Sequence, residues 1–387
     1  MPGENITIKS ATGSETLPDF VRVPKLLYKD DPHWIAPLDM ERRDHFSSRH
    51  NPYFAHARTR FFVAYDADGT PVGRVTAQID NQEETYATIG HFGCLEAANK
   101  EVMAVLLQAA ESWLKERDIQ EVTGPYSLSI NDEVGLLVSG HNQPAKLMMN
   151  YAPAWYADAL EELGYEKAKD LYAYEIDVDA PLPPTSKKMA ESALKKENVH
   201  ERPIQMRQLQ GELNTVMDIF NDAWSDNWGF TPMTQAEISY MAKNLRPILV
   251  PSMARIIEVD GAPAGMIVAL PDVNQALRGL GGRLLPFGWL KLFYRLKMKG
   301  LTSGRVVLMG VRKKYQNTRL GGALAAALVV RLHEEGVKRG FKHVELSWIL
   351  EENTAMSKII EFVGGTHYKT YRIYRKSLTE GKKNAGK

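Results

Sequence analysis

Hydrophobic and polar positions repeat one order of elements in the two halves of the chain. In each half, two alternating runs flank an Asp-Gly dipeptide, which is typical of a β-hairpin; the hairpins cover residues 61–78 and 254–270. A stretch with helical periodicity follows each hairpin, at residues 101–117 and 323–339, and leads into a short strand. Each half then closes with an amphipathic helix, a glycine and an alternating strand. We therefore predict an α/β fold of two tandem copies, each with a mixed β-sheet.

A proline-rich segment separates the two copies. Between Asp179 and Lys187, three prolines fall within four residues, and this density opposes regular secondary structure. The length of 387 residues is sufficient for two domains. We predict a first domain at residues 1–180 and a second at residues 181–387.

Composition excludes several classes of protein. The chain is 44% apolar and 25% charged, as in ordinary globular proteins, and its net charge of +1 provides no overall attraction to nucleic acid. Cys94 is the single cysteine, so an internal disulfide and a multi-cysteine metal site are excluded, and no histidine pair has metal-ligand spacing. We expect no metal. There is no signal-peptide pattern and no apolar run near the ~18 residues of a membrane span, which predicts a cytoplasmic protein.

A basic turn in the second half has the features of a phosphate-binding site. The apolar strand at residues 306–311 leads into a turn that contains Arg312, Lys313, Lys314 and Arg319 and ends in two glycines before a helix. Backbone N–H groups at a helix start, flanked by cations, bind pyrophosphate well. The pattern predicts a site for a phosphate-bearing cofactor.

The turn resembles the cofactor signature of the GNAT superfamily of acyl-CoA-dependent N-acyltransferases. That signature is Gln or Arg, two residues, Gly, one residue, then Gly or Ala; here residues 316–321 read Gln-Asn-Thr-Arg-Leu-Gly, so Arg319 replaces the first glycine. We expect this to narrow the backbone freedom of the turn and to add a cation near the phosphates. Ile360 stands where the family often has a tyrosine that acts as general acid. The first half lacks a paired-glycine turn and is interpreted as a degenerate copy that shapes the acceptor site.

A narrower resemblance covers nearly the whole chain. Residues 131–135 (Asn-Asp-Glu-Val-Gly), 224–230 (Trp-Ser-Asp-Asn-Trp-Gly-Phe) and 271–274 (Pro-Asp-Val-Asn) are similar to segments of the bacterial ceramide synthase group. The loop at residues 131–135 is equally consistent with an Asx-type turn. The resemblance implies transfer of a long-chain fatty acyl group from acyl-CoA to the amine of a sphingoid base, 3-ketosphinganine.

The resemblance also implies the residues that bind acyl-CoA. The pantetheine and carbonyl would lie along the end of the second-half strand, and the pyrophosphate on the turn and helix start. These positions, with the asparagine of the family's next helix, are Met309, Gly310, Val311, Gln316, Asn317, Thr318, Arg319, Leu320, Gly321, Gly322, Ala323 and Asn353.

The groups that transfer protons and hold the acceptor are candidates with structural alternatives. Glu345 alternates with apolar neighbours and faces either the active centre or solvent. Asp272 is either a base or a turn and cap residue, and Tyr371 is either a proton donor or a packing residue. A set of aromatic and polar residues suits the binding of an acyl or sphingoid chain: Trp224, Asn227, Trp228, Phe230 and Asn274. Two tryptophans after an amphipathic helix are, alternatively, packing residues at a corner of the hydrophobic core.

A basic insert at residues 275–303 points to a lipid partner. Residues 273–333 contain twelve Lys or Arg and no acid. Within the insert, Trp289, Leu292, Phe293 and Leu296 form one helical face, and Lys291, Arg295 and Lys299 form another. Such a helix can lie on the inner-membrane surface as a lid over the acyl chain, which predicts a peripheral location. Two alternatives are that the helix packs on the core, or that its cations attract the 3′-phosphate of CoA. Nucleic acid is disfavoured as a partner because base stacking needs aromatic residues spread over an exposed groove, whereas these lie on one helical face.

Three functions are consistent with these patterns. The first is an N-acyltransferase that uses long-chain acyl-CoA on a lipid amine. The second is a GNAT acetyltransferase that uses acetyl-CoA on a small soluble amine. The third is a non-catalytic, membrane-associated protein that binds acyl-CoA or lipid, because Arg319 and Ile360 depart from the family pattern.

Overall fold

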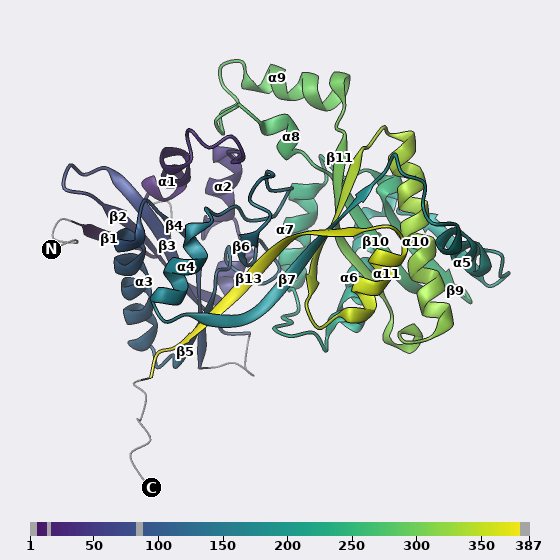
Figure 1. Ribbon diagram of the computed structural model, residues 1–387, viewed down its shortest axis with the longest axis horizontal. Coiled ribbons are helices and arrows are strands. Elements are labelled where there is room, and N and C mark those ends of the chain that lie inside the picture. The colour runs from purple at the N-terminus through teal and green to yellow at the C-terminus, as the bar shows by residue number, and fades with distance from the viewer. Residues whose placement is uncertain (1–5, 14–16, 83–87, 380–387) are drawn as a thin grey trace, which may run out of the picture. The chain divides into compact units, whose positions relative to one another are not determined.

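The computed structural model describes residues 6–13, 17–82 and 88–379, and its contacts divide the chain into two compact units (Figure 1). Unit 1 consists of Met1–Asp170, Leu277–Arg283 and Thr370–Lys387. Unit 2 consists of Leu171–Ala276 and Leu284–Lys369. Each unit contains one β-sheet with helices on its faces, so the predicted α/β fold with mixed sheets is confirmed.

Unit 1 has the strand order β1-β2-β3-β4-β5-β13, in which β4 and β5 are parallel and the other pairs antiparallel. Its strands are β1 (Thr7–Ala11), β2 (Ala57–Tyr65), β3 (Pro71–Asp80), β4 (Ile89–Ala97), β5 (Glu121–Gly124), β6 (Leu136–Ser139) and the end of β13 (Thr366–Ser377). Its helices are α1 (Asp19–Leu27), α2 (Asp39–His45), α3 (Lys100–Lys115) and α4 (Trp155–Glu162), with a 3-10 turn at Pro52–Ala55.

Different helices cover the two faces of the unit 1 sheet. Helix α3 lies so close to one face that a Cβ at Gly73 would meet Val102 Cγ1 at 2.6 Å, and glycine permits this approach. The other face carries an aromatic cluster in which the rings of Phe20 and Phe61 pack edge to face with centroids 4.9 Å apart.

Unit 2 has the strand order β7-β12-β11-β10-β9-β8, in which β11 and β12 are parallel. Its strands are β7 (Glu166–Asp177) from Leu171 on, β8 (Val199–Pro203), β9 (Ala254–Val259), β10 (Ala262–Pro271), β11 (Ser303–Val311), β12 (His343–Leu350) and the start of β13, up to Lys369. Its helices are α5 (Pro184–Leu194), α6 (Leu209–Trp224), α7 (Gln235–Leu245), α8 (Asn274–Leu277), α9 (Gly288–Tyr294), α10 (Arg319–Lys338) and α11 (Thr354–Phe362), with a π-helix at Arg295–Lys299 and 3-10 turns at Met206–Gln208, Pro251–Met253 and Lys313–Tyr315.

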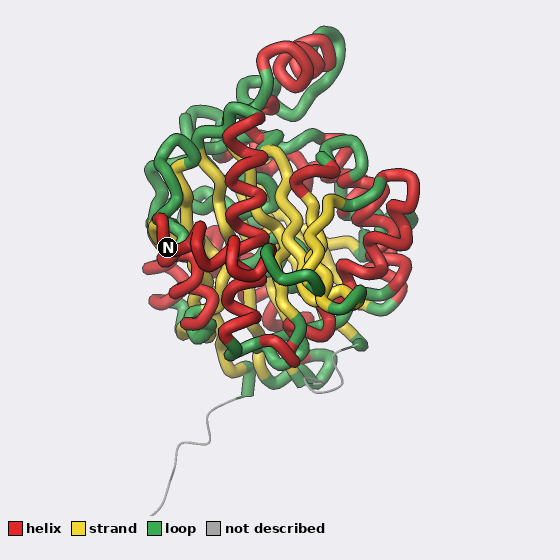
Figure 2. Tube along the Cα trace, turned by 90° about the vertical axis from the view of Figure 1, so that its right-hand side faces the viewer, coloured by secondary structure: helices red, strands yellow, loops and turns green. Residues whose placement is uncertain are grey.

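The unit 2 sheet also has a separate core on each face, so its strands run between helices (Figure 2). Ile267 and Leu324 belong to the core beneath α5 and α10. Met266 and Phe220 belong to the core beneath α6. Met266 and Ile267 are neighbours in β10 and point to opposite faces, as strand alternation requires. No helix in the described ranges is both long enough and apolar enough to cross a bilayer.

The duplicated element order extends through both units. The predicted hairpins are β2–β3 and β9–β10, and the predicted helices after them are α3 and α10. The final strands are exchanged: β13, from the second half, pairs with β5, and β7, from the first half, pairs with β12. The units therefore differ from a division at residue 180, because strand pairing and not chain order decides where each final strand lies. The proline-rich segment becomes helical at Pro184, where α5 begins.

Candidate active site

Unit 2 contains an opening between two parallel strands. β11 and β12 pair only from Ser303 opposite His343 to Val306 opposite Leu346, and beyond this point no pairing joins them. A cavity with about 520 Å³ of free space, its open mouth included, lies at the divergence. Its lining residues are Trp224, Asn227, Val306, Val307, Leu308, Met309, Leu346, Ser347, Trp348, Ile349, Leu350, Asn353, Met356 and Ile360.

The cavity wall is mainly apolar, with a few polar groups. Met356 and Ile360 reach it from α11, and Ile360 is almost fully buried there in the position of the family's tyrosine. Trp224 closes another side, where its Nε1 donates to Met309 O at 3.1 Å. Asn227, Ser347 and Asn353 supply polar atoms. An apolar cleft with few polar groups suits a flexible thioester-linked chain.

The predicted phosphate loop forms the start of helix α10. Thr318 is the N-cap, and its Oγ1 accepts from Gly321 N at 3.0 Å and donates to Tyr315 O at 2.6 Å. The N–H groups of Arg319 and Leu320 have no carbonyl one turn earlier, as at the start of any helix. These donors, at the positive end of the helix dipole, are suited to bind a pyrophosphate.

Arg319 does not constrain the turn in the way that the sequence suggested. It is the first residue of α10 and has a negative φ, so its position needs no glycine. The left-handed conformation falls instead on Asn317, with φ of 58°, and asparagine tolerates that conformation better than most residues. The turn therefore forms without the family's first glycine.

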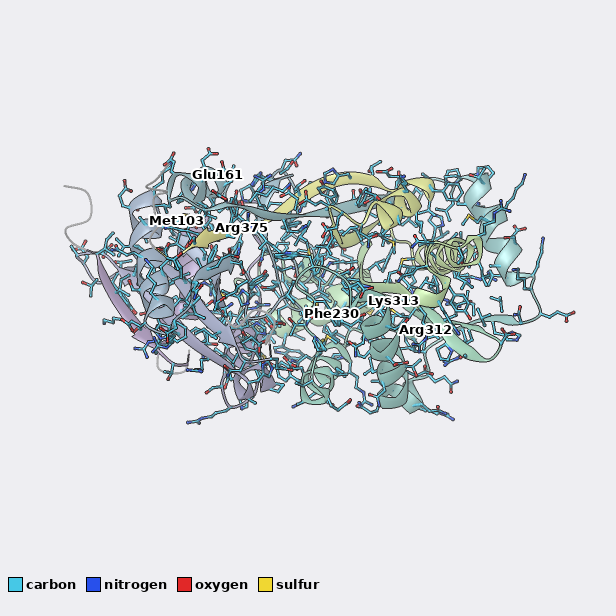
Figure 3. All side chains as sticks on the ribbon, turned by 90° about the horizontal axis from the view of Figure 1, so that it is seen from below. Met103, Glu161, Phe230, Arg312, Lys313 and Arg375 are labelled. Carbon is cyan, nitrogen blue, oxygen red and sulfur yellow. The ribbon has the colours of Figure 1, made fainter. Side chains whose placement is uncertain are left out.

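The four cations of the loop have two kinds of environment. Arg312 and Lys313, which lie just after β11 (Figure 3), form ion pairs with Asp218 and Asp226. Lys314 and Arg319 are exposed, and no acidic partner in the described chain pairs with them. They are therefore the cations available to an anionic ligand.

Gln316 supports the loop through its side chain. Its Nε2 donates to Val311 O at 2.9 Å and to Ala223 O at 3.2 Å. The first residue of the signature therefore joins the loop to the ends of β11 and α6. This contact leaves the backbone N–H groups as the main phosphate donors.

Glu345 lies at the centre of a buried polar network behind the cavity wall. It is fully buried in β12, which rules out the solvent-facing alternative. Ser347 Oγ and Tyr368 OH donate to its carboxylate. Arg305 Nε lies 3.4 Å from Glu345 Oε1 and donates to Ser347 Oγ at 2.7 Å. Ser347 lines the cavity and thus connects it to Glu345.

Ser347 was not among the residues identified from sequence. The only available signal was its position two residues after Glu345 in a strand, which places both side chains on one face. Arg305 and Tyr368 come from β11 and β13, so their contacts with Glu345 depend on the tertiary structure.

Several predicted site residues lie outside the cavity wall. Asp272 is buried at the end of β10, where its carboxylate accepts from Ser303 Oγ at 3.1 Å. Asn274 begins α8. Phe230 packs on Phe220 with ring centroids 5.6 Å apart, and Trp228 is half-buried.

Among the remaining predictions, the structure brings Trp224, Asn227 and Asn353 together in the wall. Asn353 also caps α11, since its Oδ1 accepts from Met356 N at 3.1 Å. Tyr371 is fully buried in unit 1.

The equivalent opening in unit 1 is filled by the chain itself. β4 and β5 pair in parallel from Ile89 to His91, as β11 and β12 do at their start. Just beyond, Tyr126 N donates to Phe92 O at 2.9 Å. A Cβ at Gly93 would lie 1.5 Å from Tyr126 O, so backbone occupies this space. Unit 1 therefore leaves no room here for an extended cofactor.

The segment at residues 131–135 contributes to a partly buried polar cluster in unit 1. Asp132 Oδ2 accepts from Ser129 Oγ at 3.0 Å, and Ser129 Oγ accepts from Asn131 N at 3.2 Å, which is the backbone contact of a serine turn and not of an Asx-type turn. Arg42 donates to both oxygens of Glu133, at 2.9 and 2.7 Å. Burial favours the neutral acid, but the Arg42 guanidinium outweighs it and holds the pKa of Glu133 below its usual value.

A second carboxyl of this cluster, that of Glu96, makes the stability of unit 1 depend on pH in a predictable direction. Burial raises the pKa of Glu96 from 4.5 to about 7, against the opposing effect of Arg74. The folded state then binds more protons than the unfolded state between these pH values, so stability falls as pH rises through the interval, by about 3 kcal/mol in total. We expect Glu96→Gln to remove this component in urea unfolding at pH 5 and pH 8. Glu101→Gln, at an exposed position, should lose as much unfolding free energy between pH 5 and pH 8 as the wild type. If Glu96→Gln also lost as much as the wild type, the raised pKa of Glu96 would be contradicted.

Within the described residues, no group of three or more His, Cys, Asp or Glu side chains is arranged to hold a metal ion.

Comparison with known proteins identifies the family. A model of the acetyltransferase (GNAT) family matches residues 25–124, in the half without the glycine turn. The chain is 43% identical over 363 residues to the bacterial ceramide synthase of Caulobacter vibrioides, covering 93% of this chain and 94% of that protein. It is 40% identical over 375 residues to protein YghO of Escherichia coli, covering 96% and 95%.

Solved structures agree on the fold. A tandem GNAT protein from the clavulanic acid biosynthesis pathway superposes with a TM-score of 0.56, covering 97% of this chain and 99% of that one, at 11% identity. This similarity extends the GNAT fold to both halves. The chain therefore belongs to the tandem GNAT-fold, acyl-CoA-dependent N-acyltransferases, in the group that includes the bacterial ceramide synthase.

Proposed function

We propose that this enzyme transfers a long-chain fatty acyl group from acyl-CoA to the amine of a sphingoid base, with 3-ketosphinganine as the acceptor. The observation that carries the proposal is the similarity to the bacterial ceramide synthase along nearly the whole chain. The apolar cavity of unit 2 supports it, because a small acetyl group would not need a wall of this composition.

The strand opening suggests where acyl-CoA binds. The edge of β11 that faces β12 loses its pairing after Val306, so backbone groups there are available to the amides of pantetheine. The α10 start, with Lys314 and Arg319, would bind the phosphates. The acyl chain would then extend along the wall toward Met356.

Ser347 and Glu345 are placed to remove the proton of the attacking amine. As the amine nitrogen bonds to the thioester carbon, its proton passes to Ser347 Oγ while the Ser347 proton passes to Glu345 Oε1. The carbon–sulfur bond then breaks, and the CoA thiolate takes a proton from solvent while Glu345 releases to solvent the proton that it received. Arg305 holds both Ser347 and Glu345 in position. The predicted first domain, residues 1–180, would shape the acceptor site, and the predicted second domain, residues 181–387, would carry the chemistry.

The direct test is binding and turnover with a series of acyl donors. We expect palmitoyl-CoA to bind more tightly than acetyl-CoA or free CoA in calorimetry, and to be consumed in the presence of 3-ketosphinganine with release of free thiol. Equal binding of acetyl-CoA and palmitoyl-CoA would favour acetyl transfer to a small amine. Absence of turnover with every sphingoid base would refute the proposed acceptor.

Met356 provides a test of the chain's path. We expect Met356→Trp to narrow the cavity and to lower kcat/KM for palmitoyl-CoA about tenfold or more, since several methylenes worth ~0.8 kcal/mol each would lose their contacts. Short-chain donors should be nearly unaffected. Kinetics with donors of increasing length would measure this, with Ile359→Trp as a control on the same helix but outside the lining. An equal loss for all donors would place the acyl chain elsewhere.

A further inference from the structure

The insert of unit 2 presents a concentrated hydrophobic surface. Seven of the ten large hydrophobic side chains that are exposed in the described chain fall within residues 285–298: Leu285, Phe287, Trp289, Leu290, Phe293, Tyr294 and Met298. Leu285 is 79% exposed and Phe287 is 73% exposed. Figures 1 and 2 show α9 beyond the ends of the unit 2 strands, and Figure 1 shows the short helix α8 beside it. Exposed apolar clusters of this kind mark interaction sites.

The charges of the insert are of one sign. Lys291, Lys297 and Lys299 are exposed, and no acid occurs anywhere between residues 273 and 333. Arg295 behaves differently from the sequence expectation, because it is half-buried and its Nη1 donates to Ala276 O at 2.8 Å. The expected stripe of Lys291, Arg295 and Lys299 is therefore replaced by three exposed lysines around the apolar residues.

We infer that residues 284–299 of unit 2 dock on the surface of a lipid bilayer that contains anionic phospholipid. Aromatic and aliphatic side chains would enter the boundary between head groups and acyl chains, while the lysines remain at the phosphates. Charge complementarity selects this occupant over a second copy of the chain, because two such surfaces would repel each other. The helical part is too short to span a bilayer, so it would lie along the surface.

This inference extends the proposed function by supplying access to a bilayer-resident acceptor, and it can fail separately from that function. If acyl transfer occurs with detergent-dispersed acceptor but the protein does not bind vesicles, only the docking surface is wrong. If the protein binds vesicles without any turnover, only the proposed acceptor is wrong.

The test is vesicle flotation of the full chain with phosphatidylcholine alone and with added phosphatidylglycerol. We expect binding only with the anionic lipid, decreasing at high salt. The variant Lys291→Glu/Lys297→Glu/Lys299→Glu should bind about a hundredfold more weakly or worse, given the attraction per basic residue. Trp289→Ala/Phe293→Ala should also weaken binding, and should do so at every salt concentration.

A matched control separates local docking from overall charge. Lys187→Glu/Lys188→Glu/Lys196→Glu changes three exposed lysines of unit 2 outside the insert and should float like the wild type. Equal loss in both triple variants would mean that charge alone drives binding and would overturn the inference. Wild-type flotation of the insert triple variant would do the same. Concentration-dependent dimerisation that is abolished by Trp289→Ala/Phe293→Ala would assign the surface to a second copy.

Discussion

Replacing Gly321 with alanine is expected to weaken binding of acyl-CoA about a hundredfold. A Cβ at this position would lie 2.0 Å from Tyr315 O, the carbonyl that accepts from Thr318 Oγ1. Tyr315 and Thr318 would have to separate from Gly321, and the helix start would then turn its N–H groups away from the phosphates. Loss of two hydrogen bonds to a charged group, each worth about 1.5 kcal/mol, corresponds to this change in affinity. Calorimetry with palmitoyl-CoA measures it.

The neighbouring glycine is the control. A Cβ at Gly322 would meet only Met189 Cε, at 2.9 Å, and the end of a methionine side chain can move. Gly322→Ala should therefore bind acyl-CoA like the wild type, and should stabilise α10 because alanine favours helix over glycine. Wild-type affinity in Gly321→Ala, with the helix intact by circular dichroism, would show that the phosphates bind elsewhere.

The order of elements and the phosphate loop could be predicted because their signals are local. Each hairpin depends on an Asp-Gly turn between alternating runs, and the start of α10 depends on adjacent residues from Thr318 to Gly322. The exchange of β7 and β13 had no such signal. Each strand alternates in the same way whichever sheet it joins, so only the tertiary pairing reveals its neighbour.

The residues of the candidate active site also fall into those that could be predicted from sequence and those that could not. Trp224 and Asn353 could be named because their types and segments suggested binding, and both lie in the cavity wall. The network of Glu345 could not be derived, since Arg305 and Tyr368 are distant in sequence and act only through contact. The alternation of apolar and polar residues in the sequence does not distinguish a buried, paired carboxylate from an exposed one.

The two copies differ where the strand opening meets the loop. In unit 2 the opening leads to a cavity and to an α10 start with backbone donors and two exposed cations. In unit 1 the equivalent opening is filled around Tyr126, and Asn99 caps α3 without a basic, glycine-containing turn. The match of the GNAT family model to residues 25–124 therefore indicates that the first half has kept the sequence features of the GNAT fold. The features suited to acyl-CoA occur in the second half.

Replacing Ser347 with alanine is expected to lower kcat about a hundredfold to a thousandfold, with little change in the affinity for acyl-CoA. Ser347 Oγ is the polar atom that joins the cavity to the fully buried Glu345, and its loss removes the route by which the amine proton reaches the carboxylate. Positioned general base catalysis contributes about this much to rate. Steady-state kinetics at saturating palmitoyl-CoA and calorimetry together separate kcat from binding.

Tyr368→Phe is the matched control, because it removes the other hydroxyl that donates to Glu345 and leaves Ser347 intact. Each variant deletes one hydrogen bond to the same buried carboxylate, and Ser347→Ala also removes the acceptor of Arg305 Nε. A purely structural network therefore predicts a loss of stability from both variants, larger for Ser347→Ala, and no large loss of kcat from either. A proton path through Ser347 predicts a large loss of kcat only in Ser347→Ala, with Tyr368→Phe within a few-fold of the wild type. Equal kcat values in the two variants would remove Ser347 from the reaction and leave Glu345 as a structural partner of Arg305, whose buried charge it neutralises.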